Sequence, residues 1–174
     1  MKRRMKLIIT IIIAVLIVYL PIWRFWPKSL CDLMSVEENS IKIISVSAYV
    51  FNINAPGMSQ HDLYQLKDLE QQSNISQEIV DILSSSGYRE DFRTLWPWGV
   101  KSISADRNYD GRNVSLFFEI ENQEGKAGYI YYTTNSLISV HGMRKRGFSV
   151  YHPTNRETFD VLVEYIQEHG IKEQ

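Results

Sequence analysis

The sequence has a single cysteine, Cys31, and lacks the patterns from which catalytic and metal sites are usually recognised. One cysteine excludes an intramolecular disulfide and any zinc site built from cysteines, and none of the four histidines has a partner at ligand spacing. The nucleophile-elbow, HExxH, phosphate-loop and SxxK motifs are also missing. We therefore expect no metal and no cofactor, and we favour a non-catalytic protein over an enzyme.

Acidic side chains are absent from residues 1–30, although this segment carries six of the 19 basic ones. The rest of the 174-residue chain holds 13 basic and 20 acidic residues, which gives it a net charge of -7. Nucleic-acid binding requires a basic surface that neutralises phosphates. An acidic body therefore excludes nucleic acid as an expected partner.

A basic tail at residues 1–6 is followed by a run without charge from Leu7 to Trp23. A bilayer-crossing helix needs about 17–25 apolar residues, and Trp23 and Trp26 have the character of interfacial anchors. We predict a transmembrane anchor over residues 7–26. The four positive charges of the tail exceed the two that follow the run, so the N-terminus is expected in the cytoplasm and the body outside it.

Two other kinds of leader fit this segment less well. A cleaved signal peptide has a shorter apolar core and a small-residue cleavage site, whereas large and charged residues follow the run here. A lipoprotein signal places small residues before its cysteine, and Lys28 argues against it. Residues 27–40 are expected to form a juxtamembrane linker. Within it Cys31 has two interpretations, a reduced thiol or an intermolecular disulfide in a dimer.

The body, residues 41–170, is predicted to be an α+β domain with one antiparallel sheet and helices on one face. The Ile- and Val-rich segment 41–53 predicts a long first strand. Residues 59–87 are predicted to be helical with an interruption, and residues 59–72 fit a strand as an alternative. Short connectors rich in turn formers then join antiparallel neighbours. The further strands are predicted at Val100–Ala105, Asn113–Glu121, Gly128–Thr134, Leu137–His141 and Phe148–His152.

Capping signals set the expected helix boundaries. A serine or threonine followed three residues later by an acid is typical of a capping box, and glycine is typical of a helix end. The predicted caps are Ser59 with Asp62, Ser76, and Thr154 with Glu157, and the predicted ends are Gly87 and Gly170. The expected order is a strand, a helix, a meander of about five strands and a C-terminal helix.

The segment Asp106–Asn113, with the sequence DRNYDGRN, begins like the calcium loop of an EF-hand. Such a loop needs a bidentate acid at its twelfth position, which is Phe117 here, and Glu119 comes two residues too late. The residues that follow alternate as in a strand. We therefore predict a hairpin turn in which Gly111 takes a positive φ, and no calcium site.

Two groups of residues are candidates for a ligand or partner surface. The first is aromatic and forms either a platform for a sugar ring or a peptide, or part of the core. The second is a basic hairpin tip that either contacts anionic headgroups or an acidic partner, or is a solvated turn. The aromatic candidates are Trp96, Trp98, Tyr129 and Tyr131, and the basic candidates are Arg144, Lys145 and Arg146.

These patterns favour a membrane-anchored binding or accessory module of the bacterial cell envelope. Its expected partners are the membrane, crossed by a single span, and an envelope protein or a second copy of the chain. The alternative is an envelope hydrolase or metal-dependent enzyme with a site near His141 and His152, which flank one predicted hairpin. Convergence of these two histidines with a carboxylate would favour the enzyme.

Overall fold

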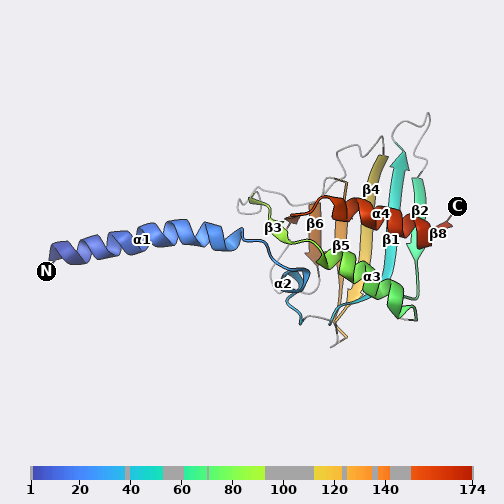
Figure 1. Ribbon diagram of the computed structural model, residues 1–174, viewed down its shortest axis with the longest axis horizontal. Coiled ribbons are helices and arrows are strands. Elements are labelled where there is room, and N and C mark those ends of the chain that lie inside the picture. Colours follow the sequence, from blue (N-terminus) through green and yellow to red (C-terminus); the bar gives the residue numbers. More distant parts are fainter. Residues whose placement is uncertain are drawn as a thin grey trace.

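The computed structural model describes residues 2–37, 40–52, 61–69, 71–92, 112–122, 125–134, 137–141 and 150–173. Helix α1 projects from a body that is built on one sheet (Figure 1). The helices of the described part are α1 (Lys2–Arg24), α2 (Leu30–Met34), α3 (Ser73–Ser84) and α4 (Glu157–His169). Its strands are β1 (Lys42–Asn52), β2 (His61–Leu66), β3 (Tyr88–Glu90), β4 (Arg112–Glu121), β5 (Ala127–Thr133), β6 (Leu137–His141), β7 (Val150–Pro153) and β8 (Ile171–Glu173).

The described strands form one antiparallel sheet in the order β3-β7-β6-β5-β4-β1-β2-β8. Strands β4 to β7 are neighbours in sequence order, as short connectors predict. Strand β1 lies between β2 and β4, and its pairing with β4 runs from Lys42 opposite Glu121 to Asn52 opposite Arg112. The α+β class with one antiparallel sheet is confirmed.

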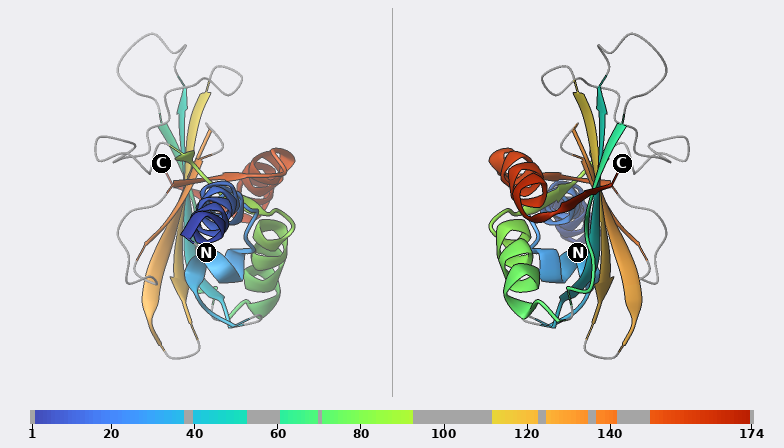
Figure 2. Two further views of the ribbon diagram at one scale, coloured as in Figure 1. Left: turned by 90° about the vertical axis from the view of Figure 1, so that its left-hand side faces the viewer. Right: turned by 90° about the vertical axis from the view of Figure 1, so that its right-hand side faces the viewer.

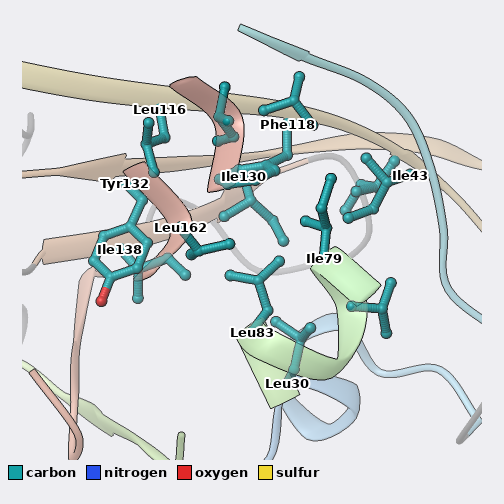
Figure 3. Close-up of a cluster of buried hydrophobic side chains, with 14 of the residues drawn as sticks. Leu30, Ile43, Ile79, Leu83, Leu116, Phe118, Ile130, Tyr132, Ile138 and Leu162 are labelled. Atoms are coloured by element: carbon teal, nitrogen blue, oxygen red, sulfur yellow. The ribbon is translucent and has the colours of Figure 1, made fainter. Parts of the chain in front are cut away.

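One face of the sheet, here called the inner face, is covered by α2, α3 and α4 (Figure 2). Side chains alternate between the faces of a strand, so the cross-strand neighbours Ala48, Leu116, Tyr132 and Ile138 all point inward. All four are fully buried, and the helices add apolar side chains to the same cluster (Figure 3). Full burial of a large apolar side chain contributes about 1.5–3 kcal/mol, so this cluster holds helices and sheet together.

Residues 27–40, predicted to be a linker, contain a short helix that belongs to the core. Ser29 Oγ accepts a hydrogen bond from the Asp32 backbone N–H, and the Asp32 carboxylate accepts one from the Ser29 backbone N–H. This capping box begins α2, and Leu30, Leu33 and Met34 of α2 are buried in the core cluster. The folded body therefore starts before residue 41, where the sequence placed its first residue.

Within residues 59–72 the strand alternative holds, because His61–Leu66 forms β2. The helical interpretation of this stretch and the capping role of Asp62 are wrong. Pairing with the edge of β1 outweighs the loose leucine spacing that suggested a helix. The Asp62 carboxylate instead forms an ion pair with Lys172 of β8 at 2.9 Å.

Ser76 does not cap α3, which begins three residues earlier at Ser73. It lies inside the helix, where its Oγ accepts a hydrogen bond from the Ile43 N–H (3.1 Å) and donates one to the Ile43 carbonyl (3.2 Å). The β1–β4 register shifts between Ile43 and Ser45. Ser76 therefore fixes α3 to the strand at the place where the regular ladder is interrupted.

The ends of the last helix follow the prediction only in part. Helix α4 ends with Gly170 as its C-cap, as expected, but its N-cap is Arg156. The predicted cap, Thr154, uses its Oγ1 to accept a hydrogen bond from the Gly87 N–H at 3.0 Å. Helix α3 likewise ends at Ser84, before the predicted stop at Gly87. Both differences arise because tertiary contacts hold these two residues.

Arg24, at the end of helix α1, forms an ion pair with Glu90 of β3 at 2.8 Å. Among the described residues, no helix combines the length and the hydropathy that a membrane crossing requires. The transmembrane span over residues 7–26 stays a prediction. The predicted strand Val100–Ala105 and residues 106–111 of the predicted turn Asp106–Asn113 lie outside the described residues, and the last two residues of that turn begin β4.

Candidate functional site

The face of the sheet opposite α2, α3 and α4, here called the outer face, gathers aromatic and polar side chains from four neighbouring strands. The described part of the chain places no helix on it (Figure 2). The register puts the odd-numbered residues of β4, β5, β6 and, beyond the register shift, of β1 from Ser45 on this face. They are Ser45, Ser47, Tyr49, Phe51, Asn113, Ser115, Phe117, Glu119, Glu121, Ala127, Tyr129, Tyr131, Thr133, Leu137, Ser139 and His141.

Three rings form a ladder across β4, β5 and β6. The Tyr129 ring centroid lies 5.2 Å from that of Phe117, at an interplanar angle of 30°, and 4.5 Å from that of His141, at 12°. Because Phe117 and His141 belong to the strands on either side of β5, both faces of Tyr129 are directed toward neighbouring rings. Tyr129 is nevertheless 38% exposed. It therefore presents its edge and its hydroxyl to a ligand rather than a bare ring face.

His141 is the ring of the ladder on β6, and its Nε2 lies 3.0 Å from the Oγ of Ser139. Burial lowers the pKa of His141 below its ordinary value, because an imidazolium loses hydration there. The ring is therefore neutral at pH 7 and can act as a hydrogen-bond acceptor or donor. A neutral ring also stacks on Tyr129 without adding positive charge to this face.

Beside the ring ladder, the outer face carries hydroxyl and amide groups. The Tyr131 hydroxyl donates to the Oγ of Ser115 at 3.0 Å. Three other polar atoms, Thr133 Oγ1, Asn113 Oδ1 and Gln65 Oε1, are buried and have no hydrogen-bond partner among the described residues. Buried polar atoms are normally paired with protein or with ordered water. These atoms are therefore hydrogen-bonding positions for water or for a ligand.

A hollow of about 590 Å³ lies beside the ladder at the closed end of the β4–β5 hairpin, and we call it the β4–β5 hollow. Two rings, Phe117 and Tyr129, and two carboxylates, Glu119 and Glu121, line it. Its remaining described lining is apolar or lacks a side chain, and consists of Ile44, Ile120, Gly125, Ala127 and Gly128. The hollow thus combines aromatic, acidic and apolar surface on rigid strands.

Glu119 is held in place from the neighbouring strand, because the Ser45 hydroxyl donates to its Oε2 at 2.7 Å. Among the described residues, no basic side chain forms an ion pair with Glu119 or Glu121. Gly125 closes the hairpin with a φ of 74°, and a Cβ there would lie 3.3 Å from the Glu121 Oε1. The hairpin end therefore leaves room for the Glu121 carboxylate at the edge of the hollow.

The two histidines of the predicted enzyme site do not converge. Ser139 pairs with Val150, so the same register places His152 opposite Leu137, four residues along the strand from His141. At about 3.3 Å per residue the two histidines are about 13 Å apart along the sheet. His152 instead lies 2.9 Å from the buried carboxylate of Asp91. Within the described residues, no group of His, Cys, Asp and Glu side chains could hold a metal.

Of the predicted surface residues, the structure places Tyr129 and Tyr131 together on the outer face. Their neighbour Tyr132 points inward and is buried, so the aromatic run is divided between surface and core. Trp96, Trp98 and the basic tip at 144–146 lie outside the described residues. Sequence reasoning missed Ser45, Phe117, Glu119, Glu121 and His141 as members of this surface, although their shared odd numbering was a usable signal within each strand.

Comparisons with known proteins assign no function. No protein-family model matches the chain, and neither does any curated protein or solved structure. The functional proposal therefore rests on the chemistry of the sequence and on the outer face of the sheet.

Proposed function

We propose that the chain is a membrane-anchored binding or accessory module of the bacterial envelope, without catalytic activity, whose body lies outside the cytoplasm. The observation that carries this proposal is the outer face, where a ring ladder and the β4–β5 hollow lie on rigid neighbouring strands. Binding sites combine apolar and aromatic walls with a few placed polar groups, and the hollow has this composition.

The anchor is proposed from the sequence pattern. Its supports are the uncharged run from Leu7 to Trp23, the basic tail before it, and the excess of positive charge on the N-terminal side. The large apolar side chains described between Met5 and Trp23 of α1 are 47–65% exposed. A helix with exposed apolar side chains on all sides is better solvated by lipid than by water.

A hydrolase or metal-dependent enzyme, the alternative, is not favoured. Such a site would need a nucleophile or metal next to a correctly oriented base. His141 stacks on Tyr129, His152 pairs with Asp91, and the register keeps the two histidines apart. No observation within the described residues supports a reaction near them.

Site-specific photocrosslinking in native membranes tests the binding function. A photoreactive amino acid replaces Tyr129 on the outer face, and the control replaces Val161, which is 45% exposed on α4. We expect a discrete adduct from position 129 and none from position 161. Equal labelling from both positions, or labelling from neither, would contradict a ligand site on the outer face.

The proposed topology is tested separately with protease. Protease added to intact spheroplasts should digest the body and leave a fragment of about thirty residues that contains the N-terminal run. A body that stays intact until the membrane is lysed would place it in the cytoplasm. Because this assay does not depend on a ligand, it separates an error in topology from an error in the binding surface.

A further inference from the structure

We propose that the β4–β5 hollow binds an organic cation, an ammonium group with apolar substituents, through Phe117, Tyr129, Glu119 and Glu121. This inference rests on the proposed binding function and names the class of ligand for the same face. Three features of the hollow favour this ligand: its charge, its rings and its apolar floor.

The charge of the hollow favours a cation. Glu119 and Glu121 stand two positions apart on β4, so both point to the outer face, with Cα atoms about 7 Å apart. Among the described residues neither carboxylate forms an ion pair and no lysine or arginine lines the hollow, while Lys42 of β1 lies opposite Glu121 in the register. The Ser45 hydroxyl donates to the Glu119 carboxylate, which orients this acceptor without neutralising it.

The rings favour a cation over a stacked sugar. An ammonium group is attracted by the electron-rich face of an aromatic ring, most strongly where water is excluded. Tyr129 has rings on both sides, which leaves no bare face for a pyranose. Phe117 ends the ladder, and no further ring within the described residues lies on its other side. The hollow therefore has one aromatic wall available to a small charged group.

The apolar floor favours an ammonium with carbon substituents over a metal ion. Ile44 and Ala127 provide surface that methyl or methylene groups can cover. A hard metal ion would need several oxygen ligands converging on one point, and the described residues contain no such group. The volume of about 590 Å³ lies in the range of small-molecule sites.

The test uses the full chain in a polyoxyethylene detergent, which carries neither a sugar nor a cation. Choline and its neutral carbon isostere 3,3-dimethylbutan-1-ol are titrated separately and followed by calorimetry. The two probes have nearly the same shape and differ in charge. We expect choline to bind and the isostere to bind at least about tenfold more weakly, because the isostere lacks the attraction to rings and carboxylates.

Variants locate the binding. Glu119→Gln combined with Glu121→Gln should weaken choline binding at least about tenfold, and Phe117→Leu should weaken it by a similar factor. Glu164→Gln is the matched control, because Glu164 is exposed on α4, remote from the outer face. Far-ultraviolet circular dichroism and the unfolding midpoint of each variant show whether it is folded. A variant that does not fold is replaced by the corresponding single substitution.

Three results would overturn the inference: no choline binding, equal binding of choline and the isostere, or full affinity in the folded double variant. Titration with N-acetylglucosamine separates this failure from failure of the proposed function. A sugar that binds, with binding lost in Phe117→Leu, would refute the cation and leave a binding module. Absence of all ligand binding together with absence of a crosslink at position 129 would refute both.

Discussion

Replacing Leu33 by alanine tests whether residues 30–34 are part of the folded body or of a linker. Leu33 is fully buried in the core cluster. Replacing a buried leucine by alanine typically costs about 2–5 kcal/mol, because contacts are lost and a cavity remains. A residue in a flexible linker would change the free energy of unfolding by no more than about 0.5 kcal/mol. The two interpretations therefore differ by at least about 1.5 kcal/mol.

In a domain of this size, 1 kcal/mol shifts the unfolding midpoint by about 2–4 °C, so Leu33→Ala should lower it by about 4–20 °C. The matched control is Leu16→Ala, the same change in α1, where the side chain is 47% exposed. The control should leave the unfolding of the body unchanged. Both variants are measured as the full chain in detergent, by thermal scans of circular dichroism.

A second readout comes from Cys31, which carries the only thiol of the sequence and lies in α2 next to buried residues. Its labelling by a maleimide should accelerate in Leu33→Ala, because local opening of α2 becomes less costly. In Leu16→Ala the labelling rate should equal that of the parent chain. A Leu33→Ala protein with an unchanged midpoint and an unchanged labelling rate would refute the assignment of α2 to the core.

Three further predictions concern single positions. Burial lowers the pKa of His141, so as the pH drops through the ordinary value of about 6.5 the unfolded state binds more protons than the folded state. The free energy of unfolding should therefore fall as the pH drops through this value, and it should level off below the folded pKa. Urea titrations of His141→Phe should show a weaker pH dependence. A Cβ at Gly170 would collide with the Ile166 carbonyl oxygen, so Gly170→Ala should lower the free energy of unfolding by about 1–3 kcal/mol. It should also raise the rate of hydrogen exchange in β8, and an unchanged rate would contradict this collision. Calcium should leave the unfolding midpoint unchanged relative to chelator, and a rise that is abolished by Asp106→Ala would revive the calcium site.

The sequence predicts three strands of the central sheet well, namely β1, β4 and β6. Residues 113–121 alternate clearly, and the structure has β4 at Arg112–Glu121. The strand at Leu137–His141 is confirmed with the predicted limits, and the first strand differs only by its end residues. Alternation is the signal in β4, whereas four consecutive residues of β6, Leu137 to Val140, are buried, and this strand was predicted from the short turn-rich connectors beside it.

The elements that the sequence did not predict are short and depend on tertiary contacts. Strands β3 and β8 have three residues each, too few to establish a period, and they form because a sheet edge is available to them. Helix α2 has five residues and is stable only through the burial of its apolar side chains. A local signal for it did exist, since Ser29 followed by Asp32 is a capping box.

Caps were predicted less well than strands because a hydroxyl group has several competing partners. Ser76 and Thr154 each have the residue type and the position of a cap. In the fold both use their oxygen atoms for a backbone group distant in sequence, on Ile43 and on Gly87. A local hydrogen bond and a tertiary one differ little in energy, so the packing of the helix on the sheet decides between them.

The candidate site shows the same limit of sequence reasoning. In the sequence, Glu119 is only an acid that comes two residues too late to complete a calcium loop. The pairing of β1 with β4 brings Ser45, 74 positions away, to 2.7 Å from its carboxylate, and the β4–β5 hairpin brings Tyr129 opposite it. Within a strand, parity predicts which side chains share a face, but it cannot predict which strand lies alongside. The ring ladder and the β4–β5 hollow are products of strand order, so a test of their function must change side chains on β4 and β5 together with a control on α4.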